Sequence, residues 1–471
     1  MPYGALVISI PGRFLVLLAL LGAAVGVEAD PGRLRITANH RYLEFTDGTP
    51  FFYLGDTAWA LFNRLSREES SHYLANRAAK GFTVIQAVVL APEGGLTIPN
   101  ADGDLPLVGQ DLAQPNEAYF KHVDAVVKQA GDLGLVMGLL PSWGAYWRQT
   151  GRKEPGLFTP DKAHGFGLFL GRRYRESAVI WILGGDQDVV SPADRAVIDA
   201  LATGLREGDG GAHLITFHPR GPGFSSDALG DAAWLDFNMV QSSHGAHDHD
   251  NGLFIEHDYA LTPPKPVVDG EPRYEQMPVG FYFSDVSRLD RFDDADVRQA
   301  AYWALLAGAC GHTYGDNNVW QFWAPGREAA IWADQRWSDS LDAAGAFQMG
   351  LLRRLFESRP FTLLAPAPAM LRDAPASGGA KVRAACATDG SFAFIYSPRG
   401  EHFTVDKNFL KAARTREIWY DPRYGTSHLV HTTDTHGFQT YTPPTTGRGQ
   451  DWVLIIEDAA RNWPLPGASA K

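Results

Sequence analysis

The segment "VIWILGGDQD", residues 179–188, combines two features that seldom occur together. Its apolar start is typical of a strand covered on both faces, where carboxylates are costly unless they are paired. It nevertheless ends in Asp186 and Asp188, just past Gly184 and Gly185. Both features are explained if the strand belongs to a barrel of parallel strands, because barrel strands open onto a functional site at their carboxyl ends.

Segments of this kind alternate with segments of helical periodicity over about 300 residues, as in a repeated βα pattern. Eight strand candidates follow one another, most of them with a helix candidate behind them, and this order predicts a (β/α)8 TIM barrel. Ser66 and Glu69 have the spacing of a capping box at the start of one such helix. A doubly wound sheet is the rival fold, but "LGDTAW" (residues 54–59) is not the glycine-rich phosphate turn that this fold would show.

The first 29 residues have the pattern of a secretory signal peptide. Arg13 precedes the apolar run "FLVLLALLGAAVGV", and Val27 and Ala29 are the small residues that precede a signal peptidase cut. Cleavage near Ala29 would leave a secreted or periplasmic protein without a stable membrane span. A membrane anchor is the alternative, although a run of about 14 residues is short for a span of about 20.

Two domains are expected after this segment. Residues 30–360 would form the barrel with an N-terminal hairpin, whose turn is marked by Asp47 and Gly48. Residues 361–471 contain strand-like runs broken by Asp, Gly and Pro, without long helical periods. This pattern is typical of a small all-β sandwich domain.

Charge and cysteine content exclude several classes of protein. The net charge is −12 and no cluster of Lys and Arg occurs, which argues against a nucleic-acid partner. Cys310 and Cys386 are the only cysteines, so the core rather than disulfides should stabilise the chain, and the sequence leaves open whether they pair. No metal-type cysteine spacing is present and we expect neither a metal nor a cofactor, while the oligomeric state is not indicated.

Polar and aromatic residues collect where the expected strands end, which is where barrel active sites lie. Carboxylates, amides, imidazoles and aromatic rings predominate there and basic residues are almost absent, which suits a polysaccharide or oligosaccharide better than a phosphorylated substrate. The expected contacts to sugar hydroxyl groups are Asp56, His218 and His244, and the expected stacking residues are Trp59, Trp143, Tyr274 and Trp320.

Two of the strand-end residues form a candidate catalytic pair. Asp186 would end the fourth strand and Glu271 the seventh, so both carboxylates can flank one bond across the barrel mouth. A glycosidase needs one carboxylic acid to protonate the leaving oxygen and one carboxylate at the anomeric carbon, and a separation of about 5 Å gives retention. The structural alternatives are a helix cap for Asp186 and an ion pair for Glu271, and Asp188 is expected to bond the loop.

Six blocks of the sequence, in order, resemble the apiosidase-like catalytic domain of glycoside hydrolase family 140. They are "GTPFFYLGDTAW", "WILGGDQD", "LITFHPRG", "DFNMVQSSH", "KPVVDGEPRYE" and "GHTYGDNNVWQFW". The resemblance covers roughly residues 33–360 and implies a (β/α)8 barrel and retaining hydrolysis, with Asp186 as acid/base and Glu271 as nucleophile. It further implies an activity on β-linked apiose in pectic rhamnogalacturonan II.

The tail resembles the small β-domain that follows this catalytic domain and that carries a collagen-binding label, although nothing in residues 362–471 gives a physical reason to bind a triple helix. Two other functions stay open on the residues themselves. One is a furanosidase or exo-glycosidase for another sugar, and the other is a glycan-binding barrel without turnover. His247 and His249 lie two apart in a polar loop, where a metal site is conceivable but is not needed for the expected hydrolysis.

Overall fold

The computed structural model describes residues 32–151 and 156–467 of the chain. The expected signal peptide, residues 1–29, lies outside the described residues. The described chain begins with a three-stranded antiparallel sheet of β1 (Leu34–Ile36), β2 (Leu43–Phe45) and β3 (Pro50–Phe51). Gly48, at φ 89°, allows the tight turn between β2 and β3, so the expected hairpin is present.

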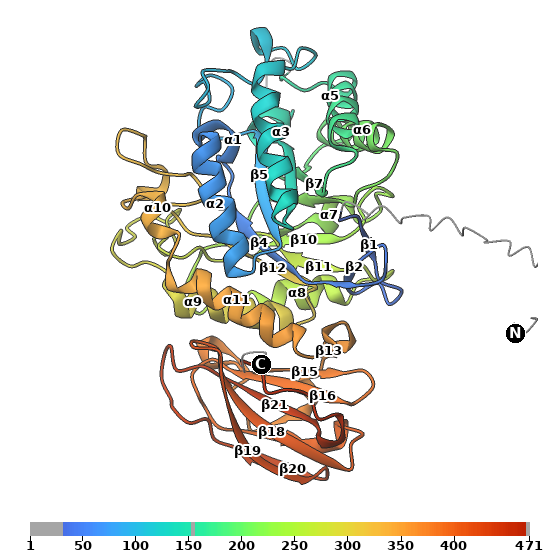
Figure 1. Ribbon diagram of the computed structural model, residues 1–471, viewed down its shortest axis with the longest axis vertical. Helices are drawn as coiled ribbons and strands as arrows, with labels where there is room; N and C mark the ends of the chain where they lie inside the picture. Colours follow the sequence, from blue (N-terminus) through green and yellow to red (C-terminus); the bar gives the residue numbers. More distant parts are fainter. Residues whose placement is uncertain (1–31, 152–155, 468–471) are drawn as a thin grey trace, which may run out of the picture. The chain divides into compact units, whose positions relative to one another are not determined.

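A barrel follows this hairpin, and it confirms the predicted fold class (Figure 1). Its eight strands, in chain order, are β4 (Tyr53–Thr57), β5 (Val84–Leu90), β6 (Val136–Ser142), β7 (Val179–Gly184), β8 (Ile215–His218), β10 (Asn238–Gln241), β11 (Val267–Asp269) and β12 (Gly311–Tyr314). Neighbouring strands pair in parallel from β4 to β8, from β10 to β12, and between β12 and β4. The short strand β9 (Gly223–Phe224) adds to β10 in the antiparallel sense.

The barrel is completed between β8 and β10 by separate hydrogen bonds instead of a regular ladder. The Asp236 amide donates to the Ile215 carbonyl at 2.9 Å, and the Thr216 hydroxyl donates to the Phe237 carbonyl at 2.7 Å. Every residue of the eight strands is buried. This burial is why β5 and β7 have nearly continuous apolar sequences instead of alternating ones.

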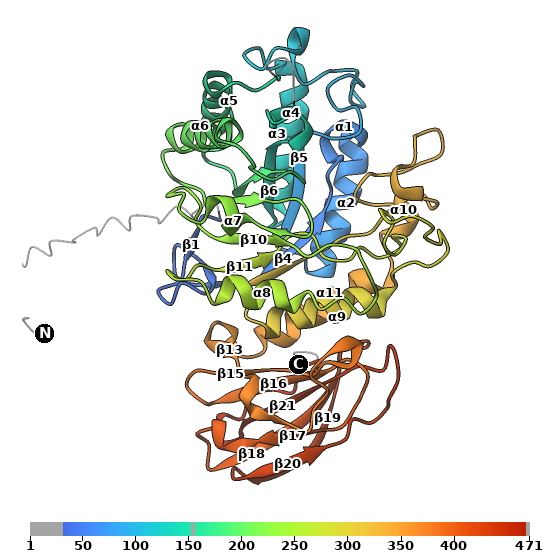
Figure 2. The same ribbon diagram turned by 180° about the vertical axis from the view of Figure 1, so that it is seen from behind.

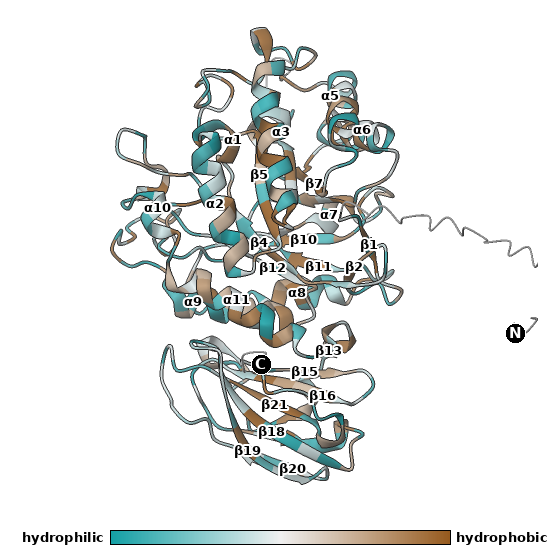
Figure 3. Cartoon of the chain, viewed as in Figure 1, coloured by the Kyte–Doolittle hydropathy of each residue, from teal (hydrophilic) through white to brown (hydrophobic). Residues whose placement is uncertain are grey.

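Helices surround the strands, as the views from the two sides show (Figures 1 and 2). They are α1 (Leu61–Arg64), α2 (Arg67–Lys80), α3 (Glu117–Asp132), α4 (Gly144–Trp147), α5 (Pro160–Tyr174), α6 (Pro192–Asp209), α7 (Ser225–Leu229), α8 (Gly252–Tyr259), α9 (Asp294–Leu306), α10 (Trp337–Ser340) and α11 (Ala344–Glu357). Ser66 caps α2 in the predicted capping box with Glu69. Hydrophobic colour runs along β5, while α2 and α3 mix both colours because only one face of each helix is buried (Figure 3).

The segment after α11 folds as two antiparallel sheets around a shared core, which confirms the predicted β-sandwich. The larger sheet has the order β13 (Leu364–Pro366), β15 (Arg383–Ala387), β16 (Phe392–Ser397), β21 (Trp452–Asp458), β18 (Arg414–Asp421) and β19 (Thr426–Asp434), and the smaller one has β14 (Leu371–Arg372), β17 (Phe403–Asp406) and β20 (Phe438–Tyr441).

The outer face of the larger sheet packs on the barrel helices α9 and α11. Tyr396 stacks on Tyr302 of α9 with ring centroids 4.7 Å apart, and Arg298 of α9 forms a buried bidentate ion pair with Asp451 at 2.6 and 2.8 Å. Strands β15, β16 and β21 of this sheet are therefore buried on both faces, whereas β19 at its edge is largely exposed. Cys310 and Cys386 are both buried and both free, so they do not form a disulfide. Within residues 32–151 and 156–467, no helix is both long and apolar enough to cross a membrane.

Candidate active site

The loop after β7 holds Asp186 in a left-handed backbone conformation. Gly184, Gly185 and Asp186 have φ values of 94°, 90° and 58°. A side chain at Gly184 would lie 2.3 Å from the His218 carbonyl oxygen, so only glycine fits there. The Gly185 amide donates to that carbonyl at 3.1 Å, and the Trp147 indole donates to the Gly184 carbonyl at 2.6 Å. These contacts hold Asp186 in a backbone conformation that costs free energy in a non-glycine residue. Strained conformations of this kind are common at functional sites.

Glu271 follows β11 and is held by two imidazoles from neighbouring strands. The Nε2 atoms of His244 and His218 each lie 3.1 Å from one of its carboxylate oxygens, Oε1 and Oε2 respectively. The Gly270 amide donates to the Val240 carbonyl at 2.8 Å, which fixes the backbone just before Glu271. The carboxylate is thereby oriented from both sides.

His218, at the end of β8, links the two candidate catalytic residues. The Asp186 amide donates to its Nδ1 at 3.4 Å, and its Nε2 lies 3.1 Å from Oε2 of Glu271. The ring is completely buried and lies edge-on to Trp59, with centroids 5.4 Å apart. His218, expected to contact a sugar hydroxyl group, is therefore placed behind the two carboxyl groups and is not among the residues that line the cavity.

The environment drives the two carboxyl groups to opposite protonation states. Burial and the negative charge of Glu271 raise the pKa of Asp186 to about 6. Burial also opposes ionisation of Glu271, but the contacts from His218 and His244 outweigh it and lower the pKa of Glu271 to about 2. Between these values Asp186 is protonated while Glu271 is ionised, which are the states that an acid and a nucleophile need.

Both carboxyl groups open into one cavity of about 570 Å³ at the carboxyl ends of the strands. This volume is within the usual range for small-molecule sites. Its walls are formed by Trp59, Pro92, Glu93, Trp143, Asp186, Arg220, Gly221, Pro222, Gln241, Ser243, His244, Glu271, Tyr274, Met277, Phe281, Tyr282, Trp320 and Ile331. The structure thus brings together both predicted catalytic residues, all four predicted stacking residues and His244.

Asp56 does not line this cavity, although it lies near the carboxyl end of barrel strand β4. Its Oδ2 accepts hydrogen bonds from the Arg77 Nε at 2.6 Å and from the Tyr73 hydroxyl at 2.5 Å, both on α2. The side chains of Asp56 and Arg77 are completely buried. The carboxylate is therefore engaged between strand and helix and cannot meet a sugar hydroxyl group in the cavity.

Among the described contacts, Asp186 does not cap a helix and Glu271 does not pair with Arg273. The side chain that caps α6 is Ser191, not Asp186. Arg273, close to Glu271 in sequence, instead donates to the carbonyl groups of His247 and His249 at 2.6 and 3.0 Å. Asp188 bonds the loop as predicted, because its Oδ1 accepts the Arg220 amide at 3.0 Å.

Several cavity residues were not expected from the sequence. Arg220 and Glu93 add charged groups, and Met277, Phe281, Tyr282 and Ile331 add an apolar wall. Arg220 directly follows the "HP" at the end of the fifth barrel strand, a position that could have suggested it. The aromatic run "FYF", residues 281–283, is unusual for a loop and was a second signal that went unused.

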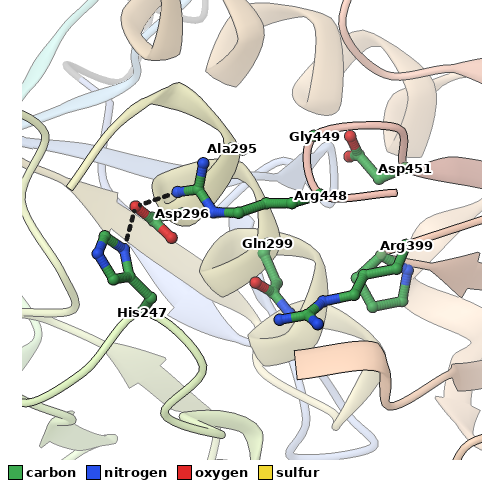
Figure 4. Close-up of a pocket in the computed structure, with 9 residues that line it drawn as sticks. His247, Ala295, Asp296, Gln299, Arg399, Arg448, Gly449 and Asp451 are labelled. Carbon is green, nitrogen blue, oxygen red and sulfur yellow. Dashed lines mark hydrogen bonds and ion pairs between the residues drawn. The ribbon is translucent and has the colours of Figure 1, made fainter. Parts of the chain in front are cut away.

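His247, considered for a metal site, instead joins two carboxylates near the β-sandwich. Its Nδ1 lies 2.9 Å from Asp296 and its Nε2 lies 2.9 Å from Asp290, and Arg448 donates to the same Asp296 oxygen (Figure 4). Among the described residues, no group of three or more His, Cys, Asp or Glu side chains is arranged to hold a metal ion.

Comparisons with known proteins identify the family of both domains. The family model described as "Apiosidase-like, catalytic domain" matches residues 37–363, and a model for a collagen-binding-like domain of a collagenase matches residues 365–457. The resemblance seen in the sequence is thus confirmed. A solved structure titled "Glycoside hydrolase" is 31% identical, with 92% of this chain and 98% of that chain covered and a TM-score of 0.84.

A glycoside hydrolase family 5 structure from Bacteroides vulgatus is similar to the same degree, with 31% identity, 92% and 95% coverage and a TM-score of 0.84. The comparison with curated proteins gives no match.

Proposed function

Because the chain belongs to the apiosidase-like family of glycoside hydrolases, we propose that it is a secreted or periplasmic retaining glycosidase that cleaves β-apiosidic linkages in pectic rhamnogalacturonan II. The observation that carries the proposal is the pair of carboxyl groups in one cavity, with the pKa of Asp186 raised and that of Glu271 lowered. The family match supports apiose as the sugar that is released, and the pair of carboxyl groups supports hydrolysis by an acid and a nucleophile.

The first step forms a covalent bond between the enzyme and the sugar. The ionised Oε atom of Glu271 attacks the anomeric carbon while Asp186 gives its proton to the departing glycosidic oxygen, so the leaving chain departs as a neutral alcohol. Asp186 is then a carboxylate. It takes a proton from a water molecule, which attacks the same carbon, releases Glu271 and yields the sugar with its original configuration.

The cavity walls suit this reaction. The indole rings of Trp59, Trp143 and Trp320 offer apolar faces to the C–H groups of a sugar ring, and Gln241 and Ser243 offer polar groups to its hydroxyls. His218 and His244 keep Glu271 ionised and oriented for attack. None of these steps needs a group beyond the side chains of the cavity and water.

The experiment that tests the proposal is sugar release from rhamnogalacturonan II, other pectins and aryl furanosides. Wild type is compared with Asp186→Asn and Glu271→Gln, and NMR identifies the anomer that forms first. We expect apiose from rhamnogalacturonan II, retention of configuration, and loss of release in both variants. Release of another sugar would refute the apiosidic specificity, inversion would refute the mechanism, and unchanged variants would refute the catalytic pair.

A further inference from the structure

A loop beside the active-site cavity presents three consecutive aromatic residues, Phe281, Tyr282 and Phe283, which we call the aromatic rim. Phe281 and Tyr282 line the cavity, and exposure increases outward, from the half-buried Phe281 to 46% at Tyr282 and 57% at Phe283. Large apolar side chains at successive exposed positions lose the benefit of burial, so contiguous groups of them commonly mark binding surfaces.

The rings of the aromatic rim form a continuous series that starts at the catalytic centre. His244, which contacts Glu271, lies with its ring centroid 5.9 Å from that of Phe281. The centroids of Phe281 and Tyr282 are 5.0 Å apart, and those of Tyr282 and Phe283 are 4.7 Å apart. The surface offered by these rings therefore continues from the cavity wall onto the outside of the molecule.

The loop that carries the aromatic rim is held at its base and along its length. The Val279 amide donates to the Asp290 carbonyl at 2.9 Å, and the Gly280 amide donates to the His244 carbonyl at 2.8 Å. The hydroxyl groups of Tyr282 and Ser243 lie 2.7 Å apart. A surface that is fixed before it meets a ligand loses less conformational entropy on binding, which suits a recognition site.

We propose that the aromatic rim is a second carbohydrate subsite, which binds a further sugar residue of the same glycan chain by contact between the ring faces and the C–H groups of the sugar. We choose a glycan as the ligand because the aromatic rim is continuous with the cavity wall. A glycan whose scissile residue lies at Glu271 must continue past the cavity edge. The inference rests on the proposed function only in taking a glycan as the ligand. With this subsite, the protein would bind longer glycan chains more tightly than short ones.

Phe283 is the residue to change, because it belongs to the aromatic rim but not to the cavity wall. Phe283→Ala removes the ring, Phe283→Leu keeps an apolar side chain without a ring, and Phe283→Trp restores one. Phe347→Ala is the matched control, since Phe347 is 51% exposed on α11, outside the cavity. Thermal unfolding of all four variants checks that the fold is preserved.

Binding is measured by calorimetry in the Glu271→Gln background, with rhamnogalacturonan II, homogalacturonan, arabinan and xylan as probes. We expect Phe283→Ala and Phe283→Leu to weaken the binding of at least one polysaccharide by about two- to tenfold, the range of one aromatic contact. Phe283→Trp and Phe347→Ala should bind as the parent does. Equal affinities in the parent and Phe283→Ala, including no binding by either to any probe, would overturn the inference.

Two further measurements separate the alternatives. Hydrolysis of aryl apiosides and aryl furanosides by the enzyme with Glu271 intact tests the proposed function without involving a second sugar residue. Sedimentation velocity tests whether the aromatic rim instead binds a second copy of the chain. A dimer that dissociates in Phe283→Ala, with unchanged polysaccharide affinity, would assign the aromatic rim to self-association and refute the subsite.

Discussion

Replacing Asp186 by asparagine should remove the acid/base group while leaving the shape of the loop intact. Burial and the charge of Glu271 raise the pKa of Asp186 to about 6. At pH 7 about one molecule in ten therefore carries the catalytic proton, whereas an aspartic acid at its ordinary pKa of 3.8 would carry it in roughly one molecule in 1,500. The raised pKa thus increases the fraction of molecules with protonated Asp186 at pH 7 by about 150-fold.

The loss in Asp186→Asn follows from what a positioned acid contributes, about 10²- to 10⁴-fold in rate. We expect a loss of this size in kcat/KM on the polysaccharide, whose leaving alcohol needs a proton. The loss should be smaller on an aryl glycoside, because a phenolate leaves without one. In wild type, kcat/KM should fall tenfold per pH unit above about 6, because deprotonated Asp186 cannot act as the acid, and this descending limb should vanish in the variant.

The assay is the pH–rate profile of kcat/KM on both kinds of substrate, with Asp188→Asn as the matched control. Asp188 lies two residues away, and an asparagine oxygen there can still accept the Arg220 amide that Asp188 accepts at 3.0 Å. The control should keep both the rate and the descending limb. A limb near pH 6 that persists in Asp186→Asn, or an equal loss in the control, would refute the assignment of the acid to Asp186.

Three other substitutions test the contacts that hold Glu271, Asp56 and the loop before Asp186 in place. His244→Ala removes the contact at 3.1 Å to Glu271, so the pKa of Glu271 should rise from about 2 and the acidic limb of the pH–rate profile should move to higher pH; a limb that stays in place contradicts this role. Arg77→Met leaves Asp56 buried without its ion-pair partner, and urea unfolding should show a loss of about 3–5 kcal/mol in stability. Gly184→Ala forces a side chain into a backbone at φ 94° and to 2.3 Å from a carbonyl oxygen, which should lower the free energy of unfolding by about 1–3 kcal/mol and reduce kcat; unchanged values of both would contradict the strain.

The fold class followed from the sequence because its cause is local and repeats along the chain. Each buried parallel strand requires an apolar run, and each covering helix requires apolar residues at helical spacing, so the order of elements can be read without knowing how they pack. The same holds for the capping box of Ser66 and Glu69, whose two partners lie three residues apart. Asp186 and Glu271 were also found in this way, since barrel topology puts the ends of strands four and seven at one mouth.

Which strand-end residues face the cavity was decided by tertiary contacts. Asp56 lies near the end of buried strand β4 and Asp186 follows buried strand β7. Asp56 is engaged by Arg77 and Tyr73 of α2, whereas Asp186 is directed into the cavity by two preceding glycines in the left-handed region. His218 was expected to contact a sugar hydroxyl group and is instead completely buried, with contacts to both Asp186 and Glu271. A linear pattern gives the type and order of such residues and not the direction of each side chain.

The sequence by itself determined the (β/α)8 barrel, the β-sandwich and the two carboxyl groups, because these depend on periodicity and on the position of a residue along its own strand. Only the tertiary structure decided the opposed pKa values of Asp186 and Glu271, the burial of Asp56 and the position of the aromatic rim beside the cavity. Each of these depends on groups that are distant in sequence and close in space. Desolvation and short-range electrostatics act through that proximity.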